Sequence, residues 1–251
     1  MLAGANAFLL EKTKKIYRGC YQQLTPLKTW CELTGYTDSN EIKYLKIIMR
    51  KTSLSNREIY HIYNRGVDKR KIFLNVRDHQ RFADSLVVFN SKQNLNGCHF
   101  SERAQFDNEE PLVNVIAYCL MPNHFHLLLE QRENLGITKF LQKMTTSYTM
   151  YFNRKNNRTG ALIQGVFKRT HIKTNARLLE MSRYIHANPI KILAAEKTSS
   201  SIKDKLLNYQ WSSFPDYAGA RNKSRIIANK QIIMDQFSSP KAYIKYVLDE
   251  T

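Results

Sequence analysis

The stretch VNVIAYCLMPNHFHLLLE, residues 113–130, decides the fold. It contains two apolar runs, Val113 to Leu120 and His124 to Glu130, separated by Met121-Pro122-Asn123. Apolar runs of strand length on either side of a Pro-Asn turn predict two paired strands that are neighbours in one sheet.

The segments on both sides of this hairpin predict further strands and helices. Segments rich in strand-forming residues predict strands, and segments in which apolar residues recur every three or four positions predict helices. In chain order we expect a strand at 59–63, a helix from Asn75 to about Asn90, the two hairpin strands, a helix at 137–152, a strand at 166–173 and a helix at 176–187. This order predicts an α+β, ferredoxin-like fold, in which a four-stranded antiparallel sheet carries helices on one face and the chain adds a C-terminal helix.

The domain organisation follows from where the motifs lie. We expect an N-terminal extension of uncertain role at 1–48, a single domain at 49–220 and a C-terminal tail at 221–251. The four cysteines form no CxxC pair, which predicts neither a disulfide framework nor a cysteine zinc site. No apolar run approaches the ~20 residues that a membrane span needs. A cytoplasmic protein without membrane contact is therefore expected.

The net charge of +18, from 39 Lys and Arg against 21 Asp and Glu, implies an acidic partner. Acidic residues are absent from Asn134 to Leu179, whereas cations accumulate there. Such a run is either a solvated face or a nucleic-acid surface. Aromatic residues within it could stack on bases or pack a core: Tyr148, Tyr151, Phe152 and Phe167. The candidate nucleic-acid contacts are Lys139, Lys143, Arg154, Lys155, Arg158, Lys168, Arg169 and Lys173.

His124 and His126 are candidate metal ligands. Strand alternation places both imidazoles on one face of the sheet, where they could chelate one cation. Taken alone, an HxH pattern is more often a pair of structural histidines held by hydrogen bonds.

Tyr184 and Asn188 are four residues apart in the last predicted helix, so their side chains share one face. The Asn188 amide oxygen could be a third ligand, with the tyrosine beside the same metal. A tyrosine of pKa ~10 becomes a nucleophile when a base or a cation assists it. His186 is expected on the surface, and His171 is a weak candidate for a further ligand or base.

Several ordered motifs together resemble those of a known family. Met121 to Leu128 resembles the HUH strand of single-tyrosine transposases, and Tyr184 to Pro189 resembles the tyrosine helix of their REP-associated branch. Four further segments also resemble stretches of that family: 60–66, 151–153, 160–168 and 211–214. Ordered motifs at family spacing are more specific than any one of them.

The resemblance implies an enzyme that cleaves and rejoins single-stranded DNA next to hairpins through a 5′-phosphotyrosine. It implies that His124, His126 and Asn188 bind Mg²⁺ or Mn²⁺, that Tyr184 is the nucleophile, and that the protein acts as a monomer or homodimer. Two other functions stay open. One is a catalytically silent protein that binds nucleic-acid hairpins. The other, a zinc hydrolase of small molecules, is disfavoured because three clustered zinc ligands are not evident.

Overall fold

The computed structural model describes residues 54–92, 110–221 and 224–249. The chain divides into two compact units, Met1–Ser53 and Leu54–Thr251, and the fold below is that of the second. The expected N-terminal extension lies outside the described residues.

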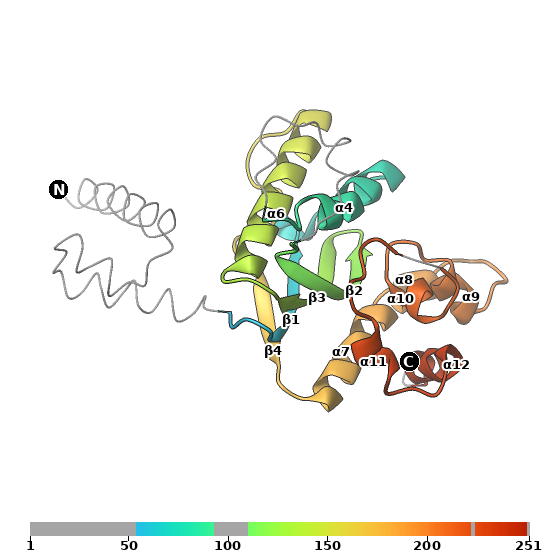
Figure 1. Ribbon diagram of the computed structural model, residues 1–251. Helices are drawn as coiled ribbons and strands as arrows, with labels where there is room; N and C mark the ends of the chain where they lie inside the picture. The colour runs from blue at the N-terminus through green and yellow to red at the C-terminus, as the bar shows by residue number, and fades with distance from the viewer. Residues whose placement is uncertain (1–53, 93–109, 222–223, 250–251) are drawn as a thin grey trace, which may run out of the picture. The chain divides into compact units, whose positions relative to one another are not determined.

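A four-stranded antiparallel sheet forms the centre of this unit (Figure 1). The strands, in the order β2-β3-β1-β4 across the sheet, are β2 (Val113–Met121), β3 (His124–Gln131), β1 (Ile59–Arg65) and β4 (Lys168–Ile172). All neighbouring pairs are antiparallel. The predicted hairpin and the ferredoxin-like sheet are therefore confirmed.

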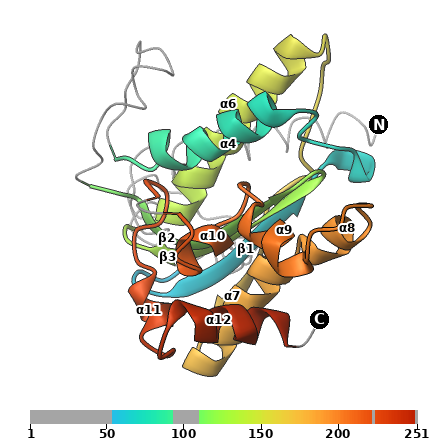
Figure 2. The same ribbon diagram turned by 90° about the vertical axis from the view of Figure 1, so that its right-hand side faces the viewer.

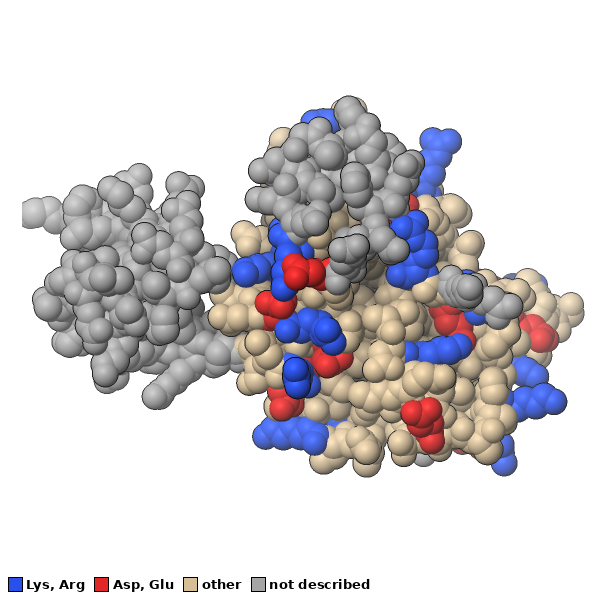
Figure 3. Space-filling view, in the orientation of Figure 1, with Lys and Arg blue, Asp and Glu red and all other residues tan. Residues whose placement is uncertain are grey.

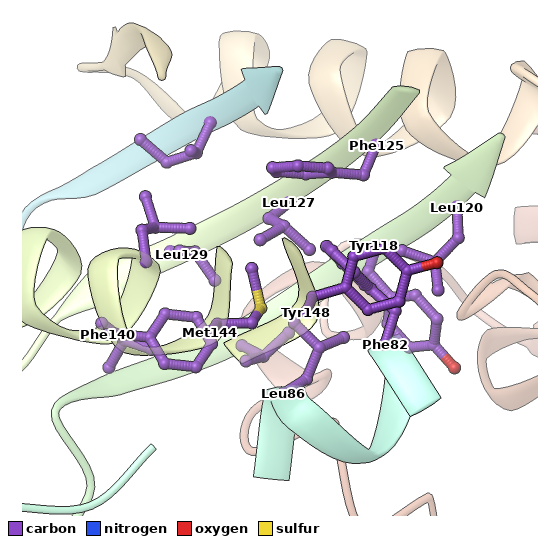
Figure 4. Packing of buried hydrophobic residues seen from close by; sticks show 14 of the residues in the cluster. Phe82, Leu86, Tyr118, Leu120, Phe125, Leu127, Leu129, Phe140, Met144 and Tyr148 are labelled. Carbon is purple, nitrogen blue, oxygen red and sulfur yellow. The ribbon is translucent and has the colours of Figure 1, made fainter. Parts of the chain in front are cut away.

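Helices α4 (Val76–Val88) and α6 (Gly136–Lys155) pack on one face of the sheet. Alternate strand residues such as Phe125 and Leu127 meet apolar side chains of both helices there (Figure 4). Asn75 caps α4, because its side chain accepts a hydrogen bond from the Asp78 amide, as predicted.

Two of the four aromatic residues of the acid-free segment belong to this core. Tyr148 is fully buried and its hydroxyl donates to the Ile72 carbonyl oxygen at 2.5 Å, and Phe152 is also buried. Their positions support the core interpretation rather than base stacking.

Helix α7 (Asn175–Ala187) covers the opposite face (Figure 2). Helices α4 and α6 are therefore the predicted helices on one face of the sheet, and α7 is the predicted additional C-terminal helix. Thr174 caps the start of α7, and the helix ends before Asn188 and Pro189 as predicted. A second apolar core lies between α7 and the strand residues that point away from α4 and α6, such as Leu128.

Short helices follow α7 and extend this second core. They are α8 (Ile190–Ala194), α9 (Ile202–Leu207), α10 (Phe214–Tyr217), α11 (Gln231–Met234) and α12 (Pro240–Leu248); a 3₁₀ turn, η1 (Val67–Lys69), follows β1. Residues 221–251 were expected to form a tail, yet Ile233, Tyr243 and Val247 are buried in the core beside α7. No helix among the described residues has the length and apolar character to cross a membrane.

Candidate active site

Strand β3 places His124 and His126 on the α7 face of the sheet. Their alternation with Phe125 is as predicted, since Phe125 belongs to the core under α4 and α6. The two imidazole rings are nearly perpendicular, with centroids 4.9 Å apart. The hairpin thus presents both rings at the end of the strand near the Pro-Asn turn.

His61 on β1 holds the ring of His126. Nε2 of His61 lies 2.9 Å from Nδ1 of His126 in a buried hydrogen bond. Nε2 of His126 is buried without a hydrogen-bond partner among the described residues. If Nδ1 of His126 carries the hydrogen and donates to His61, the lone pair on Nε2 of His126 is available to a ligand.

His124 has a similar arrangement. Its Nδ1 lies 2.6 Å from Oδ1 of Asn123, an acceptor, which assigns the hydrogen to Nδ1. Its Nε2 then carries a lone pair and lies 3.4 Å from Oδ1 of Asn188. Two electron-rich atoms therefore face each other beside His126, as donor atoms around a cation do.

Tyr184 of α7 lies against the same histidines. Its ring meets the rings of His126 and His61 edge-on, with centroid separations of 5.4 and 5.9 Å. The side chain is 51% exposed, and its hydroxyl makes no hydrogen bond to the described part of the chain. The phenol is thus accessible to solvent and adjacent to the paired imidazoles.

Burial keeps the site's imidazoles uncharged near neutral pH. Desolvation lowers the pKa of His126 to about 3, and the neighbouring His61 and His124 act in the same direction. Burial, assisted by the charge of Arg177, lowers the pKa of His61 to about 4. The pKa of His124 is also lowered by burial. Neutral imidazoles have the lone pairs that metal coordination requires.

His124, His126 and Asn188 fit a divalent cation as ligands, because two neighbouring neutral imidazoles and an amide oxygen can each offer a lone pair and the Nε2 atom of His126 is buried without a partner. No group of three or more His, Cys, Asp or Glu residues suited to a metal occurs among the described residues. The candidate set therefore has two imidazoles, one amide and no carboxylate. Nε2 of His79 also lacks a partner, but that ring is stacked between Phe73 and Trp211 and belongs to a different layer.

Two other histidines lie outside this set. The expectation that His186 is on the surface is wrong: it is fully buried, with Nδ1 2.6 Å from the Tyr243 hydroxyl and Nε2 2.7 Å from Oγ of Ser213. The covering helix α12 explains the difference. His171 pairs with Glu58 at 2.7 Å and stacks on Tyr60, which points to the α4 and α6 face, so it is not near Tyr184.

Three of the predicted basic residues make contacts within this domain. Lys155 forms an ion pair with the buried Asp78 at 2.6 Å, and Nζ of Lys143 donates to the Ser91 carbonyl oxygen. Arg158 donates to Asn153 at 2.6 Å. The face seen in Figure 3 shows Lys and Arg interspersed with Asp and Glu.

Lys168 differs from these cations in its position on the sheet. It pairs in register with Tyr63, whose ring stacks near His61 and His126. Lys168 therefore shares the face of the candidate site and is exposed there.

Residues 99–188 match the family model for IS200-like transposases. This segment is thus similar to the IS200-like transposase family. It contains His124, His126, Tyr184 and Asn188, the four residues that the fold brings together. The general activity of that family is DNA transposition.

Two solved structures are also similar to this chain. One is a REP-associated tyrosine transposase bound to a REP hairpin, with 11% identity, a TM-score of 0.43, and coverage of 70% of this chain and 90% of that one. The other is a bacterial tRNA(His) guanylyltransferase-like protein in complex with ATP, with 10% identity, a TM-score of 0.37, and coverage of 68% and 78%. At these values neither likeness assigns an activity. A search of curated proteins found no match.

His61 and Tyr63 are site residues that the sequence did not single out. They lie outside the IS200-like segment, and their place depends on the pairing of β1 with β3. The available signal was the alternation Tyr60-His61-Ile62-Tyr63, which places His61 and Tyr63 on one face of a strand.

Proposed function

We propose that this domain is a single-strand DNA endonuclease and strand transferase that acts next to hairpins, with Tyr184 as its nucleophile. The observation that carries the proposal is the exposed Tyr184 phenol beside His126, whose Nε2 is buried and unpartnered. A buried polar atom without a partner costs stability, so its retention beside an exposed phenol favours a ligand-binding role.

The reaction is a phosphoryl transfer to Tyr184. The phenolic oxygen forms a bond to phosphorus while the bond from phosphorus to the 3′ oxygen breaks. The phenol loses its proton and the departing 3′ oxygen gains one, so the products are a 5′-phosphotyrosine and a free 3′ hydroxyl. One phosphodiester replaces another, so a second 3′ hydroxyl can reverse the step and join a strand without an external energy source.

His124, His126 and Asn188 would hold a divalent cation, Mg²⁺ or Mn²⁺. When bound, such a cation would polarise the phosphoryl oxygens of the substrate. The protein's part is to fix these three ligands: Asn123 and His61 each hold one imidazole through its Nδ1 atom. Two imidazoles suit Mn²⁺ better than Mg²⁺, and a set without carboxylates predicts weak binding until a DNA phosphate adds negative charge.

Cations near the site would contact the DNA backbone. Lys168 is placed for this, since it is exposed on the face of the histidines. Phosphate contacts of this kind make affinity decrease steeply with salt. Lys155 is less suited, because Asp78 already neutralises it.

The test is a Tyr184→Phe protein incubated with Mn²⁺ and hairpin oligonucleotides labelled at the 5′ or the 3′ end. The oligonucleotides are copied from repeats that flank the gene. We expect binding to persist and both cleavage and the covalent adduct to disappear. Tyr151→Phe is the matched control, since this tyrosine lies on α6 and its hydroxyl contacts Asp78. Cleavage by Tyr184→Phe at the wild-type rate would disprove the nucleophile.

A further inference from the structure

A hollow of about 530 Å³ opens beside Tyr184, between α7, α8 and α12. Pockets that bind small ligands measure roughly 300–1,000 Å³, so the hollow is large enough for one nucleotide. Tyr184 and Asn188 form part of its lining, which makes it continuous with the candidate active site. A group bound in the hollow would therefore lie next to the phosphate that Tyr184 attacks.

The lining combines apolar side chains with cations. Ala187 and Ile190 supply apolar surface, which suits the flat face of a nucleobase. Arg183 and Lys191 supply positive charge, which suits a phosphate. This combination of an apolar wall and cations is the one that single-stranded nucleic-acid sites use.

The acidic residue in the lining does not cancel this charge. Glu180 pairs with Arg177 at 2.7 Å, so its carboxylate is already neutralised. The Arg183 guanidinium lies over the Tyr246 ring at 5.1 Å, which fixes its position in the wall. The Lys191 side chain is exposed and forms no ion pair within the described ranges 54–92, 110–221 and 224–249. The hollow thus has an exposed cation at Lys191.

We propose that this hollow binds the nucleotide adjacent to the phosphate attacked by Tyr184 and selects the base accepted there. The inference rests on the proposed function and names a substrate-binding subsite for it. Ile190, Lys191 and Val247 lie beyond residue 188, outside the segment that matches the IS200-like family. The base preference at this position is therefore set by the C-terminal helices of this chain.

The test uses the full chain with two variants of the hollow. Lys191→Ala removes a cation, and Ala187→Phe fills the apolar part. Lys203→Ala is the matched control, because Lys203 is an exposed lysine of α9 that does not line the hollow. Thermal unfolding followed by circular dichroism establishes that each variant is folded.

Two readouts are measured on the same proteins. The first is binding of single-stranded oligonucleotides that contain one 2-aminopurine, followed by its fluorescence. We expect roughly five- to tenfold weaker binding for Lys191→Ala and Ala187→Phe, and less than about twofold for Lys203→Ala. The second is cleavage of hairpin oligonucleotides that lack a base on either side of the cleaved phosphate. We expect the missing base to slow cleavage at one of these positions in the wild type and to have no effect in Ala187→Phe.

The outcomes separate the two proposals. If the wild type cleaves but neither hollow variant changes binding or base dependence, the subsite is wrong and the endonuclease proposal stands. If no protein cleaves yet both variants weaken binding, the endonuclease proposal is wrong and the nucleotide site stands.

Discussion

The two faces of the sheet differ in the hydrogen bonding of one buried polar side chain on each. On the face of α4 and α6, the carboxylate of Asp78 is fully buried and receives hydrogen bonds from Lys155, Tyr151 and the Leu74 amide. On the α7 face, His126 is also buried, but its Nε2 atom has no partner among the described residues. The buried carboxylate on the first face is thus fully partnered within the protein, whereas the buried nitrogen on the second face lacks a partner and lies beside an exposed tyrosine.

Phe125→Ala changes the face of the sheet that packs under α4 and α6, and we expect it to have the largest effect, on the free energy of unfolding. The Phe125 ring is fully buried and lies 5.1 Å from that of Phe82. Removing a buried ring of this kind lowers the free energy of unfolding by about 3–5 kcal/mol. Urea unfolding measures the loss, and the activity per folded molecule should be within about twofold of the wild type. A normal stability would show that the core under α4 and α6 is not what holds β3.

His126→Ala is the matched change one residue along the same strand, on the other face. We expect DNA cleavage to decrease by roughly 100- to 1,000-fold, because a bound cation contributes several kcal/mol to catalysis. The free energy of unfolding should decrease less than in Phe125→Ala, since removal of the unpartnered Nε2 partly offsets the loss of the hydrogen bond to His61. Single-turnover cleavage with Mn²⁺ and urea unfolding give both numbers. Unchanged cleavage would contradict the role of His126 as a ligand.

His61→Leu tests whether the hydrogen bond with His61 positions the His126 ring. Loss of the hydrogen bond to Nδ1 should weaken Mn²⁺ binding and cleavage by about 10- to 100-fold. His61→Gln retains a polar group that can reach His126, and we expect it to recover part of the loss. Mn²⁺ titration in the presence of uncleavable DNA measures the affinity. If the leucine and glutamine variants behave alike, His61 only fills space.

Lys155→Met removes the ion pair with Asp78 on the face of α4 and α6, and we expect it to have the smallest effect on stability. Burial opposes ionisation of Asp78, but hydrogen bonds, the strongest from Lys155, outweigh it and lower the pKa of the carboxyl below its usual value. This contribution is present above the unfolded pKa of about 4 and is lost as the pH falls through the folded value. The variant should therefore be about 1–2 kcal/mol less stable at pH 7, and the difference from the wild type should be smaller at pH 3.

Unfolding at the two pH values tests this change, with Arg154→Met as an exposed control. DNA affinity should decrease no more for Lys155→Met than for the control. A selective loss of DNA binding by Lys155→Met would instead support the sequence-based prediction that Lys155 contacts nucleic acid.

Local patterns predicted the parts of the site that lie within single elements. The spacing of His124 and His126 in a strand, and of Tyr184 and Asn188 in a helix, is enough to place each pair on one face. The turn at Pro122 predicted that β2 and β3 are neighbours. Such short-range signals require no knowledge of how distant segments pack.

Long-range packing explains what the sequence did not predict. His61 contacts His126 only because β1 pairs with β3 in one register, across 65 residues of chain. His186 is buried because Ser213 and Tyr243, which follow it by 27 and 57 residues, pack against its ring. Helices α8 to α11 have four to six residues each, too short for an apolar period to be recognised.

The most direct test of the central claim is the chemical state of Tyr184 after reaction. The wild-type protein is incubated with Mn²⁺ and a hairpin oligonucleotide, digested with nuclease and protease, and analysed by mass spectrometry. We predict a nucleotide linked through a 5′ phosphate to the Tyr184 side chain, and none in His126→Ala. Cleaved DNA with an unmodified Tyr184, or with the adduct on another residue, would contradict the account.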